Sequence, residues 1–124
     1  MGLRKTVLCI DEYAALLDTL APVLQPFGYD VRTAHNMSEA YEVAAQCHPD
    51  AILLEYRLCP GCAGNRGKQC AAGRFHADSP AAKMLVWCAD GSVMEHVPPC
   101  AQAVFMKPLP PPELAAHLTR VLGK

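Results

Sequence analysis

The stretch Cys9-Ile10-Asp11-Glu12 ends a short apolar run on two adjacent carboxylates. Two later apolar runs also end on a charged residue, Ile52-Leu53-Leu54-Glu55 on a carboxylate and Val104-Phe105-Met106-Lys107 on an ammonium group. Segments with helical spacing separate these runs, so the pattern predicts buried parallel strands joined by helices. The carboxyl ends of parallel strands meet at one edge of a sheet. We therefore expect Asp11, Glu12, Glu55 and Lys107 to converge in one polar pocket.

Length and composition indicate one domain with an aliphatic core. The chain has 124 residues, of which 52% are hydrophobic and 6% aromatic, and its net charge is −1. Proteins that bind nucleic acid usually cluster Lys and Arg on one face, and this charge balance does not indicate such a field. The apolar run over residues 6–10 is too short for a signal peptide or a membrane span. We expect a single cytoplasmic domain over residues 1–124, with neither nucleic acid nor a membrane as direct partner.

Hydrophobic periodicity predicts five strands with helices between them. The strands are expected at residues 5–10, 29–33, 51–54, 83–88 and 102–106. Helices are expected at residues 13–25, from Ser38 to about Cys47, and after the prolines at 110–112, with a brief one from Ser92. Pro22 is expected to kink or shorten the first helix. This order favours an α/β fold, a doubly wound parallel sheet with helices on both faces.

The order of the elements and the residues at the strand ends resemble a bacterial response-regulator receiver domain. The resemblance rests on Asp11-Glu12, on residues 49–55 followed by Pro60-Gly61, on Cys88-Ala89 and on Lys107-Pro108. It covers essentially the whole chain and implies a flavodoxin-like fold with strand order 2-1-3-4-5. It also implies a non-enzymatic module of phosphorelay signalling, with a histidine kinase or a downstream signalling protein as partner. Because no effector segment follows Lys124, we expect a stand-alone receiver that acts through protein contacts.

In receiver domains an acidic pair after the first strand holds Mg²⁺, and an aspartate ending the third strand accepts a phosphoryl group. The resemblance assigns Asp11 and Glu12 to the metal and Glu55 to the phosphoacceptor position. Glutamate at two of these positions departs from the family pattern. The extra methylene displaces the carboxylate, and a misplacement of about 1 Å costs on the order of 100-fold in rate. We expect Mg²⁺ binding to be weak or absent and ordinary aspartyl-phosphate switching to be lost.

The switch positions depart from the pattern as well. Cys88 stands where the family carries a hydroxyl residue, and a thiol is a weak hydrogen-bond donor. Val104 stands where many receivers carry a switching aromatic residue, whereas Lys107 is retained. Three interpretations of Glu55 remain open. It forms an ion pair with Lys107 that fixes the domain in one state, it is an inert polar residue, or it is itself phosphorylated.

The seven cysteines include a CxxC, Cys59-Pro60-Gly61-Cys62. This spacing suits a reversible redox pair or, together with Cys70 and His76, a zinc site. It suits equally well a turn flanked by small apolar residues. The alternative function is therefore a redox-responsive module on the same fold, with Cys59 and Cys62 as its active pair.

Overall fold

The computed structural model describes residues 5–55, 81–88, 101–106 and 110–122, with the backbone alone for residues 88, 101–103, 106 and 111. Five parallel strands form one sheet in the order β2-β1-β3-β4-β5. The strands are β1 (Lys5–Ile10), β2 (Tyr29–Ala34), β3 (Ala51–Glu55), β4 (Lys83–Cys88) and β5 (Ala101–Met106). The order confirms the predicted flavodoxin-like topology, and each strand agrees with its predicted bounds to within one residue.

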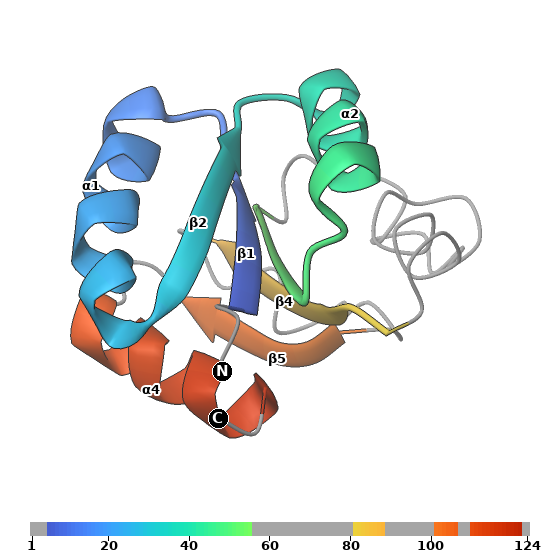
Figure 1. Ribbon diagram of the computed structural model, residues 1–124. Helices are drawn as coiled ribbons and strands as arrows, with labels where there is room; N and C mark the ends of the chain where they lie inside the picture. The colour runs from blue at the N-terminus through green and yellow to red at the C-terminus, as the bar shows by residue number, and fades with distance from the viewer. Residues whose placement is uncertain (1–4, 56–80, 89–100, 107–109, 123–124) are drawn as a thin grey trace.

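Helices cover both faces of the sheet. The described helices are α1 (Ala14–Leu24), α2 (Met37–Cys47) and α4 (Pro111–Leu122), with a short 3₁₀ helix, η1 (Gln25–Phe27). Figure 1 shows α1 and α4 packed on one face and α2 on the other. The β2 arrow points toward the edge where α1 and α2 begin, and all the strands are parallel, so both helices start at the carboxyl edge of the sheet. None of the helices in the described segments is long and apolar enough to span a membrane.

The core consists of two clusters, one on each face. Val7 and Cys9 of β1 face α1 and α4, while Leu8 and Ile10 face α2. Successive side chains of a strand point to opposite faces. Because both faces of this sheet are covered, β3 is buried along its whole length. Burial on both sides explains why the central strands read as uninterrupted apolar runs in the sequence.

Helix α1 runs through Pro22 to Leu24, so the expectation that proline would shorten it is wrong. A proline inside a helix removes one backbone hydrogen bond and costs about 3 kcal/mol. Here Pro22 is exposed, while Leu17, Leu20 and Leu24 on the opposite side are buried. Their packing stabilises the helix more than the proline destabilises it. Gly28, with φ of 98°, then ends η1 in the left-handed conformation.

Helix α2 begins one residue before the predicted Ser38, because Asn36 caps it. The Asn36 side-chain oxygen accepts a hydrogen bond from the Glu39 backbone N–H at 2.8 Å. This satisfies one of the N–H groups that a helix start leaves unpaired. At the other end, His48 adopts a left-handed conformation with φ of 49°, and Pro49 follows.

Helix α4 is joined to the sheet by an apolar stripe and by a hydroxyl chain. Leu114 and Leu118 are buried on the cluster that α4 shares with α1. The Tyr29 hydroxyl lies 3.0 Å from Thr119 Oγ1, which donates its own hydrogen to the Ala115 carbonyl at 3.0 Å. Since the Thr119 hydroxyl has one hydrogen, Tyr29 is the donor in the first contact. These two hydrogen bonds hold the start of β2 against α4.

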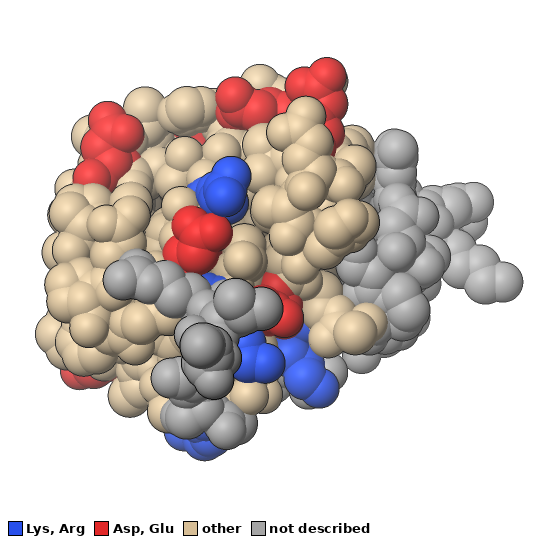
Figure 2. Space-filling view, viewed as in Figure 1, with Lys and Arg blue, Asp and Glu red and all other residues tan. Residues whose placement is uncertain are grey.

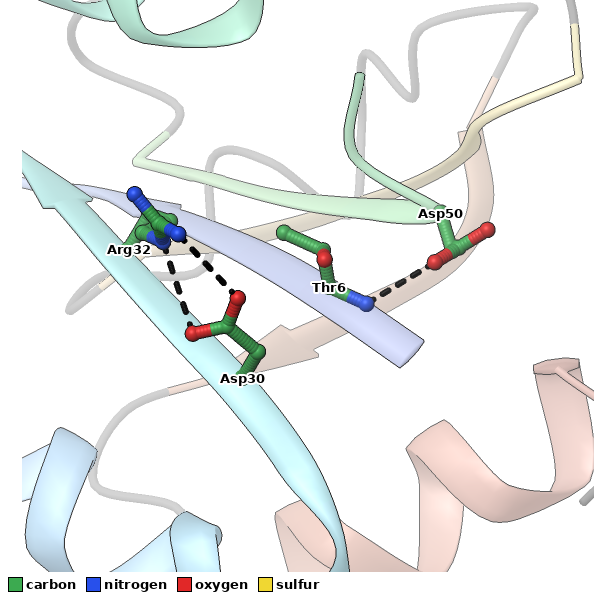
Figure 3. Close-up of polar contacts among 4 residues, drawn as sticks. All are labelled: Thr6, Asp30, Arg32 and Asp50. Atoms are coloured by element: carbon green, nitrogen blue, oxygen red, sulfur yellow. Dashed lines mark hydrogen bonds and ion pairs between the residues drawn. The ribbon is translucent and has the colours of Figure 1, made fainter. Parts of the chain in front are cut away.

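The amino edge of the sheet is held by Asp50 (Figure 3). Its carboxylate accepts a hydrogen bond from the Thr6 backbone N–H at 2.8 Å, and its own N–H donates to the Thr6 carbonyl at 2.8 Å. The Asp50 carbonyl accepts from the Lys83 N–H at 2.9 Å. The residue just before β3 thus links the beginnings of β1 and β4. The Asp30–Arg32 ion pair in the same view is exposed, and such pairs contribute little to stability.

Replacing Asp50 with alanine is expected to lower the free energy of unfolding by about 1.5–3 kcal/mol, because it leaves the Thr6 N–H without its charged acceptor. Replacing it with asparagine, which keeps an acceptor oxygen, is expected to cost less. Urea unfolding followed by far-UV circular dichroism measures both. Equal losses for the two variants would contradict the role assigned to this hydrogen bond.

Candidate functional site at the carboxyl edge of the sheet

Two carboxylates lie on adjacent strands at the carboxyl edge. Ile10 of β1 pairs with Leu54 of β3, so the next residues, Asp11 and Glu55, stand at the same level. Asp11 has 0% of its surface exposed and Glu55 has 2%. Charged side chains are almost never buried to this extent unless other groups compensate them. Two buried carboxylates at the edge where parallel strands end mark this place as the candidate site.

Asp11 is fixed by its backbone and its side chain. Its N–H donates to the Ala34 carbonyl of β2 at 3.1 Å. Its Oδ1 accepts a hydrogen bond from the Tyr13 backbone N–H at 2.9 Å, which closes a tight turn between β1 and α1. The carboxylate is therefore held at the start of α1, where the helix dipole favours negative charge.

The other predicted site residues are placed differently. Glu12 is exposed, so only the first member of the acidic pair enters the buried site. Glu55 pairs with Trp87 of β4, and Cys88 follows as the last residue of that strand. Val104 is half-buried and packs against the cluster on the α2 face. Lys107 lies outside the described residues, so its predicted approach to Glu55 stays a prediction.

The predicted cysteine sites also fall outside the described part of the chain. These residues are Cys59, Cys62, Cys70 and His76. The redox pair, the zinc site and the apolar turn therefore all remain open interpretations. Within the described segments, Cys9 and Cys47 are free thiols.

The side-chain oxygens at the carboxyl edge are of the kind that bind hard cations. Asp11 and Glu55 offer carboxylate oxygens, and Mg²⁺ is usually held by one or two carboxylates together with water or phosphate oxygens. In the described residues, no group of three or more His, Cys, Asp or Glu side chains is arranged to hold a metal ion. Any cation at this edge would therefore depend chiefly on the two buried carboxylates among the described residues.

Further acidic side chains surround this edge. Figure 2 shows them along the part of the molecule where Figure 1 places the starts of α1 and α2. Glu39 is one feature that the sequence reasoning missed, although Asn36 three residues earlier is a capping signal. The His35 N–H donates to Glu39 Oε1 at 2.6 Å, and this bond holds the pKa of Glu39 below its ordinary value. This contact orders the connection that follows Ala34, the β2 residue whose carbonyl accepts the hydrogen bond from the Asp11 N–H.

Cys9 is buried two residues before Asp11. Burial, and then the negative charge of Asp11, raises the pKa of the Cys9 thiol from 9.0 to about 12. The thiol is therefore protonated at neutral pH. Reactive cysteines need a populated thiolate, so this residue acts as an apolar packing group.

The raised pKa of Cys9 predicts a loss of stability at alkaline pH. Above pH 9 the unfolded chain releases the thiol proton while the folded chain keeps it up to about pH 12, so stability falls across this window. Between about pH 8 and pH 10 the loss should approach 1.4 kcal/mol. Urea unfolding at both pH values measures it. The Cys9→Ala variant should show a smaller loss, and an identical pH dependence would contradict the assignment.

Comparison with solved structures identifies the architecture. A response regulator from Thermotoga maritima aligns with a TM-score of 0.83 at 18% identity, covering 98% of this chain and all of that one. A CheY-like receiver domain protein from Methanospirillum hungatei aligns with a TM-score of 0.82 at 23% identity, covering 98% and 95%. The chain therefore has the fold of response-regulator receiver domains. This result confirms the fold that the resemblance at the strand ends implies.

A curated protein extends the receiver similarity to the sequence. The phosphate regulon transcriptional regulatory protein PhoB of Pseudomonas aeruginosa is 29% identical over 121 residues. The match covers 97% of this chain and 52% of PhoB, so the chain spans about half the length of that relative. No protein-family model matches the chain.

Proposed function

We propose that this chain is an atypical receiver module of two-component signalling that works through protein contacts and does not switch by ordinary aspartyl phosphorylation. The observation that supports the proposal is Glu55. This carboxylate is 2% exposed at the end of β3, beside the strand that ends at Asp11. The resemblance to receiver domains assigns Glu55 to the position of the phosphoacceptor aspartate.

The chemistry of the acceptor position favours a fixed state. Phosphoryl transfer depends on positioning the attacking oxygen, and a displacement of about 1 Å costs on the order of 100-fold in rate. The extra methylene of glutamate introduces a displacement of that size. The same carboxylate keeps a negative charge at the place where phosphorylation would add one. We propose that it pairs with Lys107 and holds one signalling state permanently.

The proposed partners follow from the receiver fold. A receiver in one fixed state would contact a downstream signalling protein or a histidine kinase without requiring a phosphoryl group. Asp11 would be the principal ligand of any Mg²⁺, with Glu55 as the second carboxylate, and both lie on the described edge. A bound cation would neutralise charge on an incoming phosphoryl group.

Incubation with acetyl phosphate and Mg²⁺, followed by intact-mass measurement, tests the proposal. The wild-type chain is expected to keep the mass of its own untreated sample, and the Glu55→Gln variant treated in the same way should likewise gain no phosphoryl group. A phosphoryl adduct on the wild type that is absent from Glu55→Gln would overturn the proposal and establish Glu55 as an acceptor.

A further inference from the structure

We draw no further inference here: the strongest candidate, the exposed His35–Glu39 pair at the β2–α2 connection beside Asp11, is accounted for by the ordering of that connection at the start of α2, and nothing in the described part of the chain shows a ligand for it.

Discussion

Replacing Glu55 with aspartate is expected to produce a chain that takes up a phosphoryl group from acetyl phosphate in the presence of Mg²⁺. The shorter side chain moves the carboxylate back by about one bond length, into the position that the receiver fold provides for an acceptor. We expect the rate of phosphorylation to exceed that of the wild type by on the order of 100-fold. Intact-mass measurement over time after mixing gives the rate for the variant and an upper limit for the wild type.

A double variant tests whether this gain depends on the neighbouring carboxylate. The double variant Glu55→Asp with Asp11→Asn keeps the new acceptor and removes the buried carboxylate beside it, so the adduct should be lost if Asp11 holds the metal. Removing one buried methylene should itself cost only about 1 kcal/mol, so the Glu55→Asp variant is expected to remain folded. A folded variant that forms no adduct would show that Glu55 is not the sole obstacle to phosphorylation.

The sequence predicted the sheet because its central strands are buried on both faces. The residues of β3 divide between the two core clusters, and neither face offers a place for a polar side chain before Glu55. The result is an unbroken apolar run, which is easy to recognise. The strand order came from the resemblance to receiver domains, since the apolar runs alone are compatible with several arrangements.

The burial of each acidic side chain could not be predicted from the sequence in the same way. Asp11 and Glu12 are adjacent and chemically similar, yet the first is buried and the second exposed. The difference arises from the turn after β1, where the Tyr13 N–H binds the Asp11 side chain and the following residues enter α1. The hydrogen bond itself is local, but the burial of Asp11 also depends on β2 and β3, which lie on either side of β1 at this level. A local sequence pattern does not specify such a long-range arrangement.

At Pro22 the local sequence signal was strong, but tertiary packing overrode it. Its intrinsic effect on a helix is among the strongest of any residue, and the sequence therefore indicated a shorter or bent α1. The tertiary environment decided the outcome, because three buried leucines hold the helix against the sheet on both sides of the proline in sequence. Propensity predicts an isolated segment well, but packing of an amphipathic face supplies most helix stability in a folded domain.

Replacing Trp87 with alanine is expected to have the largest effect on stability, a loss of about 3–5 kcal/mol. Its side chain is 1% exposed in β4. Its ring belongs to the cluster that joins the sheet to α1 and α4, where Leu53 and Leu118 also pack. Alanine would leave a large cavity there. Because whole domains are stable by about 5–15 kcal/mol, this loss would remove a large share of the total stability.

Urea unfolding followed by far-UV circular dichroism measures this effect, since the substitution removes the only tryptophan and with it the fluorescence probe. The matched variant Trp87→Phe keeps most of the buried apolar surface and should lose distinctly less stability than Trp87→Ala. A loss of less than about 1 kcal/mol for alanine would mean that the ring is largely in contact with water. Because Trp87 pairs with Glu55 across β4 and β3, that result would also place the acceptor position in a less protected site.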